Sequence, residues 1–216
     1  MSKALIPGVV SQLNEIGKTA KKPKDFFTKQ FYNRITASFH AATLFILTCT
    51  YWALILRGGN SHHGHLQVFC IDIMLGYIVY DTCHEVSVPF TIPGLSSDMF
   101  TVAHHILGAL SLSTAIYFEC QECCRYFMLI FLAEASTPLL HFGWLLHLLG
   151  SNATNSNAFK LLYIVTMILF FIFRVILGPY VFKEVVLSKN MHSEFPALYF
   201  LNTFVVGSYC LLNFKW

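Results

Sequence analysis

Charged side chains are scarce in this chain. Only 12% of its 216 residues are charged, whereas soluble domains usually carry about 25%. Hydrophobic residues make up 56%. A chain this apolar does not build one water-soluble core, so we predict an integral membrane protein. Its length suits a single bundle of spanning helices, each of which needs roughly 20 apolar residues.

Several other features are also missing. No basic surface is interleaved with aromatic residues, which argues against nucleic acid as a partner. The seven cysteines are odd in number and mostly lie in or beside apolar segments, so we expect no disulfide framework. Cys120 and Cys123 form a Cys-x-x-Cys pair without a second pair. We interpret them as small apolar or palmitoylated cysteines, with a metal or redox pair as the alternative. We predict no metal and no cofactor.

Six apolar runs are each long enough to cross a bilayer, and short polar loops separate them. They fall at 35–56, 66–82, 99–118, 124–149, 158–182 and 195–214. The sequence therefore predicts an all-α membrane protein with a single bundle of about six transmembrane helices around a central cavity. We assign residues 1–34 to a basic N-terminal arm and residues 35–214 to the membrane domain.

Both termini are predicted to be cytosolic. An even number of spans puts them on one side of the membrane. The arm, the second and fourth loops and the tail hold nine lysines and arginines, against four in the other loops. The positive-inside rule assigns the richer side to the cytosol. Asn152 heads a glycosylation sequon in the fourth loop, so we expect it to stay unmodified.

Ionisable residues inside the spans are the informative positions, because they are expensive in lipid and usually face the bundle interior. At about 1.5 Å per residue, four different helices present such residues in the cytosolic half of the membrane. This placement predicts one polar pocket that opens to the cytosol. Its residues are His40, Asp81, His84, His104, His105 and His141.

His104 and His105 are adjacent in the third span, where an unpaired imidazole costs several kcal/mol. Neighbouring helix residues point about 100° apart, so we expect one ring to face the pocket and the other to pack against a neighbour or to meet the lipid headgroups. Asp81 is expected to accept a hydrogen bond from a histidine on another helix. The alternative is that Asp81 anchors its helix at the membrane interface.

Glu134 and Arg174 lie about 15 Å and 12 Å from the luminal ends of the fourth and fifth spans, on the opposite side from the histidines. We predict an ion pair between them that fixes helix register. Glu134 and His141 are seven residues apart, so one cavity wall presents both. Pro138 between them is expected to loosen the helix.

Five short fragments follow one another along the first five spans: "NRITASFHA", "LGYIVYDTCHE", "HHILGALS", "EASTPLLHFGWLL" and "FRVILGP". Over about residues 31 to 183, the chain therefore resembles the TLC family, named for TRAM, Lag and CLN proteins, and within it the small TLC-domain membrane proteins. The resemblance implies helices around a lipid-accessible cavity. It also implies the endoplasmic reticulum or an adjoining secretory membrane.

Ceramide synthases of this family begin their signature with a His pair, which His104 and His105 match. They transfer an acyl group from acyl-CoA to a sphingoid amine, a reaction that suits a histidine as base or acyl acceptor. Their signature continues with two aspartates, whereas this chain has Glu134 as the only acid in that region. The small members are nearer, and their implied roles lie in membrane lipid composition, trafficking or sensing.

We therefore predict a protein that binds a membrane lipid, such as a sphingolipid or a fatty acyl species, in an intramembrane cavity and acts in lipid homeostasis. The alternative is a lipid acyltransferase with acyl-CoA as substrate and His104 or His105 as base or nucleophile. A proton- or metal-coupled transporter is a third possibility that the histidines suggest, although no inverted repeat is evident.

Overall fold

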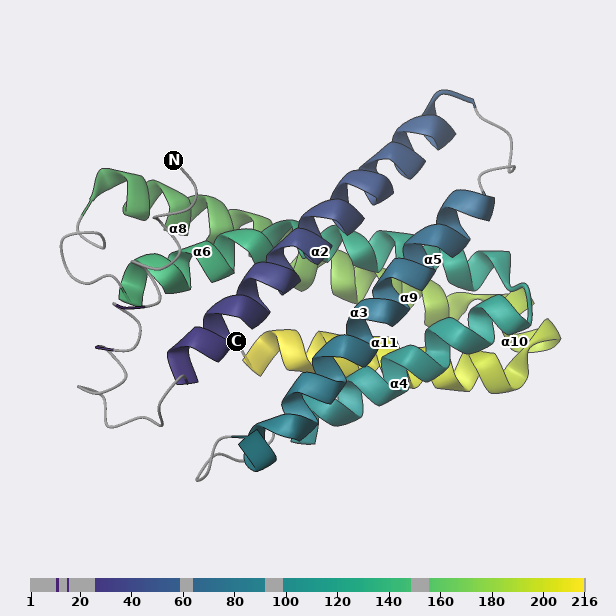
Figure 1. Ribbon diagram of the computed structural model, residues 1–216. Helices are drawn as coiled ribbons and strands as arrows, with labels where there is room; N and C mark the ends of the chain where they lie inside the picture. Colours follow the sequence, from purple (N-terminus) through teal and green to yellow (C-terminus); the bar gives the residue numbers. More distant parts are fainter. Residues whose placement is uncertain are drawn as a thin grey trace.

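The computed structural model describes residues 11, 15, 26–58, 64–91, 99–148 and 156–215. Every secondary-structure element in these ranges is helical, which confirms the predicted all-α fold (Figure 1). The elements are α2 (Phe26–Leu56), α3 (Gly64–Thr91), α4 (Met99–Tyr117), α5 (Gln121–Ile130), η1 (Phe131–Ser136), α6 (Thr137–Leu148), α8 (Asn157–Phe170), η2 (Phe171–Ile176), α9 (Leu177–Leu187), α10 (Lys189–Glu194) and α11 (Pro196–Lys215).

Five helical segments are long and apolar enough to cross a membrane. A sixth segment, Pro196–Leu211, is apolar but shorter. These six agree with the six predicted runs. The five longer ones are Phe27–Leu56, Gly64–Ser87, Met99–Tyr117, Gln121–Leu148 and Asn157–Leu187.

The first helix begins at Phe26, inside the stretch that we assigned to the arm. Lys29 and Arg34 interrupt the apolar run there but do not interrupt the helix, since both are good helix formers. Their long side chains can also extend toward the headgroups while their stems stay in apolar surroundings. The boundary of the spanning helix is therefore set by backbone propensity and not by hydropathy alone.

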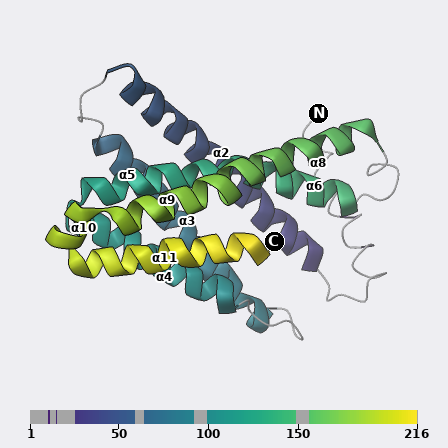
Figure 2. The same cartoon turned by 180° about the vertical axis from the view of Figure 1, so that it is seen from behind.

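Two spans change helix type near their middle. α5 continues through the 3₁₀ segment η1 into α6, and α8 continues through the π segment η2 into α9. Each irregular segment ends two or three residues before a proline, Pro138 or Pro179. A proline lacks an N–H and clashes with the carbonyl four residues before it, and that carbonyl lies inside the irregular segment in both spans. The fourth span departs from α-helical geometry before Pro138, and the segment there is the tighter 3₁₀ form. The two segments contact each other where α8 and α9 run beside α5 and α6 (Figure 2).

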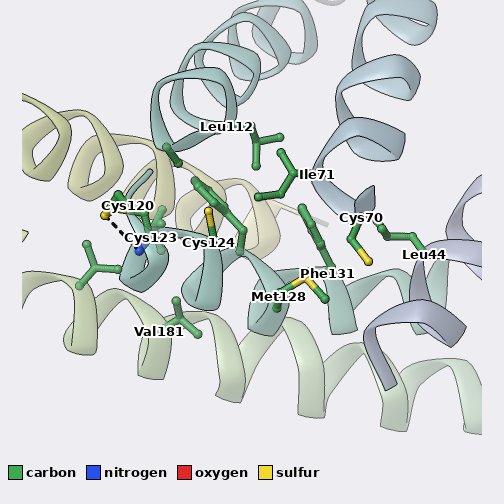
Figure 3. Close-up of a cluster of buried hydrophobic side chains, with 14 of the residues drawn as sticks. Leu44, Cys70, Ile71, Leu112, Cys120, Cys123, Cys124, Met128, Phe131 and Val181 are labelled. Atoms are coloured by element: carbon green, nitrogen blue, oxygen red, sulfur yellow. Dashed lines mark hydrogen bonds between the residues drawn. A yellow bond between two sulfur atoms is a disulfide. The ribbon is translucent and has the colours of Figure 1, made fainter. Parts of the chain in front are cut away.

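The hydrophobic core lies where α5 and η1 pack against α2, α3, α4 and α9 (Figure 3). Leu44, Ile71, Met128 and Val181 are fully buried there, and Leu112 and Phe131 nearly so. Many other large apolar side chains are exposed, including Phe39. Such exposure is expected of helices whose outer faces lie in lipid.

Cys120 and Cys123 form a disulfide at the start of α5. Cys120 caps this helix, and its sulfur accepts a hydrogen bond from the Cys123 backbone N–H (Figure 3). Our interpretation of the two as apolar or palmitoylated cysteines was therefore wrong. A cap residue and the third residue of the helix lie close, here with 5.3 Å between Cα atoms, within disulfide range. The other cysteines are free: Cys49, Cys70, Cys83, Cys124 and Cys210.

Candidate functional site

A central cavity of about 290 Å³ lies between α3, α4, α5, η1, α6, η2 and α11. Its walls are largely apolar, with Met74, Leu112 and Ile130 among the lining residues. An apolar wall with a few convergent polar groups is typical of small-molecule sites. The polar side chains that line it are Tyr77, Thr101, His104, His105, Glu134, Thr137, His141, Arg174 and Tyr209.

His104 and His105 both line this cavity, with their ring centroids 6.0 Å apart. Their rings have different partners because adjacent helix residues point about 100° apart. His105 Nε2 lies 3.7 Å from Asp81 Oδ2 on α3, and the His104 ring lies 6.4 Å from the Tyr209 ring on α11. The prediction that only one ring faces the cavity was wrong, because the cavity extends across the space between α3 and α11.

The Nδ1 atoms of the His104 and His105 rings are also informative. Nδ1 of His104 and Nδ1 of His105 are buried, and neither has a hydrogen-bond partner among the described residues. A buried polar atom without a partner costs roughly 1–3 kcal/mol. A bound molecule that offers hydrogen bonds to these rings would remove that cost.

Asp81 lies behind the wall of the cavity, between α2 and α4. Its Oδ1 accepts a hydrogen bond of 3.3 Å from Asn33 Nδ2, and its Oδ2 faces His105. The contact with His105 is longer than a normal N–H···O hydrogen bond of about 2.7–3.2 Å. Asp81 nevertheless contacts side chains of α2 and α4, and its place beside His105 favours the histidine partner over the interface anchor.

His40 and His84 differ in their relation to the cavity. The His40 ring stacks on Tyr77, with centroids 4.1 Å apart, and Tyr77 lines the cavity. His84 is not among the described residues that line it, and its backbone carbonyl accepts a hydrogen bond from Ser87. His84 shares a helix face with Tyr77 but lies about 10 Å further along the axis, beyond the end of the cavity.

Glu134 and Arg174 line the same cavity as the histidines, so their placement on the opposite side was wrong. Both lie on the irregular segments η1 and η2, near the middle of their spans. Arg174 donates from Nε to Ser136 Oγ at 3.3 Å and from Nη2 to Thr137 Oγ1 at 3.2 Å. The ion pair between Glu134 and Arg174 stays a prediction.

His141 fixes α6 against the start of α2. Its Nδ1 lies 3.0 Å from Ser38 Oγ and 3.1 Å from the Arg34 carbonyl oxygen. The Arg34 guanidinium stacks over the Trp144 ring at 4.4 Å. His141 and Glu134 line one cavity, as their spacing predicted.

Ionisable residues alone did not predict the whole site. Asn33, Thr137 and Tyr209 are neutral polar residues and were missed. A signal was present for Asn33, which stands seven residues before His40 and so lies on the same helix face. Tyr209 had no such partner in its own span.

A comparison with known protein families found one family model that matches the chain. The family model of the TLC domain, the domain of TRAM, LAG1 and CLN8 proteins, matches residues 18–216. No curated protein and no solved structure matches the chain. The matched range includes every helix from α2 to α11 and all residues that line the central cavity. The chain therefore belongs to the TLC-domain family of multi-pass membrane proteins.

Proposed function

We propose that this protein binds a membrane lipid in the central cavity and acts in membrane lipid homeostasis, trafficking or sensing. One observation carries the proposal: a single intramembrane cavity combines apolar walls with the polar groups of His104, His105, Glu134 and Arg174. We place this activity in the endoplasmic reticulum or an adjoining secretory membrane.

The chemistry of the cavity favours a lipid with a compact polar group. Acyl chains suit the apolar lining, while the two unpartnered Nδ1 atoms need hydrogen-bond partners. A hydroxyl or amide, as in a sphingolipid, donates to an imidazole nitrogen. A fatty acyl carbonyl or carboxylate accepts from Arg174. These groups make sphingolipids and fatty acyl species the classes that fit.

The test is to purify the full chain and identify co-eluting lipids by mass spectrometry. Gly108 lines the cavity, and a Cβ built there meets only Ile78, at 3.6 Å. The substitution Gly108→Leu fills the cavity and should reduce the bound lipid at least tenfold. Gly76→Leu is the matched control, because Gly76 is exposed on α3 and no atom lies within 4 Å of its built Cβ. Wild-type protein without a co-eluting lipid contradicts the proposal.

An acyltransferase is the second candidate, and the contact between His105 and Asp81 favours it. In this reaction an amine attacks the thioester carbonyl of acyl-CoA, and the imidazole takes the amine proton. The acyl group passes to nitrogen as the C–S bond breaks, the imidazolium gives its proton to the sulfur, and coenzyme A leaves as its thiol. Asp81 holds His105 in the orientation that accepts the proton.

This candidate is tested in microsomes with acyl-CoA and a panel of amine and alcohol acceptors. Turnover should fall to background in His104→Ala or His105→Ala. His84→Ala is the control, since His84 is a histidine on α3 that does not line the cavity. Turnover that survives both substitutions excludes the histidines from the reaction.

A further inference from the structure

A second cavity, of about 560 Å³, lies at the other end of the bundle. It is enclosed by the end of α2, the start of α3, the start of α5 and the end of α9. No described residue lines both cavities. Polar and apolar side chains both line the second cavity. The polar ones that matter here are Tyr51, Glu122, Arg125, Tyr126, Tyr180 and Glu184.

Hydrogen bonds fix part of its wall. Glu122 Oε1 accepts from Tyr126 OH at 3.0 Å and from Ser188 Oγ at 2.8 Å. Buried Gln67 donates to the hydroxyl of buried Tyr51. The shape of the site is therefore set before any ligand binds, which lowers the entropic cost of binding.

Two opposite charges in this cavity stay uncompensated. The Arg125 guanidinium packs over the Trp52 ring at 5.7 Å, and Glu184 accepts a hydrogen bond only through its backbone carbonyl. Within the described part of the chain, no ion pair or side-chain hydrogen bond engages the Arg125 guanidinium or the Glu184 carboxylate. The cavity thus offers one cationic and one anionic group to a ligand.

The depth of these charges matches the headgroup region of a bilayer. Arg125 is four residues from the start of α5, and Glu184 is three residues from the end of α9. At about 1.5 Å per residue, both lie within about 6 Å of the ends of their spans. A molecule in this cavity therefore reaches the membrane surface without crossing the hydrocarbon layer.

We propose that the second cavity binds a zwitterion that carries a phosphate and an ammonium group. Arg125 binds the phosphate, since a guanidinium matches phosphate oxygens in a two-pronged geometry. Glu184 and the rings of Tyr126 and Tyr180 bind the ammonium, because carboxylates and aromatic faces both attract organic cations. A simple anion meets Glu122 and Glu184, and a simple cation meets Arg125, so both fit less well.

Two sources supply this chemistry: the headgroup of a choline or ethanolamine phospholipid, and a free zwitterion such as phosphocholine. The volume lies within the roughly 300–1,000 Å³ of ordinary ligand pockets. Because no residue is shared with the central cavity, this site does not depend on the function proposed for that cavity.

The experiment uses full-length protein in detergent, freed of phospholipid. Dihexanoyl phosphatidylcholine, dihexanoyl phosphatidylethanolamine, dihexanoyl phosphatidylglycerol and free phosphocholine are titrated by calorimetry. A zwitterionic lipid should bind saturably, and Arg125→Gln and Glu184→Gln should each weaken it at least tenfold. Lys183→Gln and Glu194→Gln are matched controls, since they remove the same charges at exposed positions that do not line the cavity.

The other titrations distinguish the outcomes. Phosphocholine that binds with the same sensitivity to both variants supports the site and assigns a soluble ligand, whereas binding of the lipids alone supports the site and assigns a headgroup. Phosphatidylglycerol should bind more weakly than phosphatidylcholine to wild type. The proposal is overturned if phosphatidylglycerol binds as tightly, if no zwitterion binds, or if both variants keep wild-type affinity.

One further measurement needs no variant and so is independent of any folding defect. Phosphatidylglycerol should fail to displace phosphatidylcholine already bound to wild-type protein. If phosphatidylglycerol at equal concentration displaces all of the phosphatidylcholine, the proposal that the site binds a zwitterion is overturned.

Discussion

His105 Nε2 lies 3.7 Å from Asp81 Oδ2, and Asn33 Nδ2 donates to the other oxygen of the same carboxylate. Through Asp81, these contacts connect α2, α3 and α4 at the edge of the central cavity. Both side chains of the His105–Asp81 pair are largely buried, at 14% and 13% exposure. Charges in such surroundings are weakly screened, so the pair should be energetically coupled.

A double-mutant cycle tests that coupling. Asp81→Asn and His105→Gln should each destabilise the protein, and their combined effect should be smaller than the sum by about 0.5–3 kcal/mol, as for residues in contact. The free energy of unfolding of the two single variants and the double variant is measured in mixed micelles. The effects of Asp72→Asn and His105→Gln on the free energy of unfolding should be additive, because Asp72 is an exposed aspartate on α3, the helix of Asp81.

The sequence predicted the helices and the direction of their polar faces, but not the depth of the cavity. Hydropathy and helical period placed Tyr77, Asp81 and His84 on one face of α3, and this is what the structure has. His84 nevertheless does not line the cavity. Side chains from other helices determine where a cavity ends. The residue pattern of α3 alone contains no information on those side chains.

A second buried polar contact predicts a cost in stability. The Ser111 hydroxyl donates to Asn202 Oδ1, and Asn202 Nδ2 lies 3.7 Å from Cys123 Sγ. Ser111 and Asn202 are both buried. Asn202→Ala leaves the serine hydroxyl without its acceptor and should lower the free energy of unfolding by about 1–3 kcal/mol.

Two further variants test whether the burial of the Ser111–Asn202 contact causes this loss of stability. Ser111→Ala combined with Asn202→Leu removes both polar partners and should recover much of the loss, because neither group is then buried alone. Ser208→Ala should change stability by less than about 0.5 kcal/mol, since that hydroxyl bonds its own helix at an exposed position. A loss in Ser208→Ala equal to that in Asn202→Ala would contradict the role of burial.

The hydrogen bonds of Arg174 predict that arginine and lysine differ in the stability they give at this position. Its Nε and Nη2 donate to Ser136 and Thr137, which connects the π segment η2 to the junction of η1 and α6. Lysine keeps the positive charge but has no fork that reaches both hydroxyls. Arg174→Lys should therefore lower stability by about 1.5–3 kcal/mol, the range for hydrogen bonds to a charged group.

Thermal unfolding in detergent measures this effect, with Arg57→Lys as the control. Arg57 is exposed just beyond the end of α2, so its replacement should leave the melting temperature unchanged. If Arg174→Lys is as stable as wild type, the two hydrogen bonds do not hold the irregular segments together.

The sequence placed Glu134 and Arg174 wrongly because depth along a single helix does not show how far a cavity extends. Their depths were counted along regular helices from the luminal ends of the spans. Both residues lie near the middle of their spans on η1 and η2, and they line the same cavity as His104 and His105. Pro138 predicted an irregularity in the fourth span, but the pairing of η1 with η2 needs the tertiary structure.

The orientation of the bundle decides which membrane face each cavity meets. Excess lysine and arginine predict both termini in the cytosol, which puts the central cavity toward the cytosol and the second cavity toward the lumen. Tags fused to the two ends should both be digested by protease added to sealed microsomes. A lumenal control protein should stay intact until detergent is added.

Asn152 provides an independent measurement of the same topology. It lies outside the described residues, between α6 and α8 in the sequence, on the side that the positive-inside rule assigns to the cytosol. Glycan transfer takes place in the lumen, so treatment with an endoglycosidase should not shift the protein on a gel. A glycan on Asn152, or a protected terminal tag, would reverse the assignment. The charged residues of the second cavity would then face the cytosol, where free phosphorylated zwitterions have access to Arg125 and Glu184.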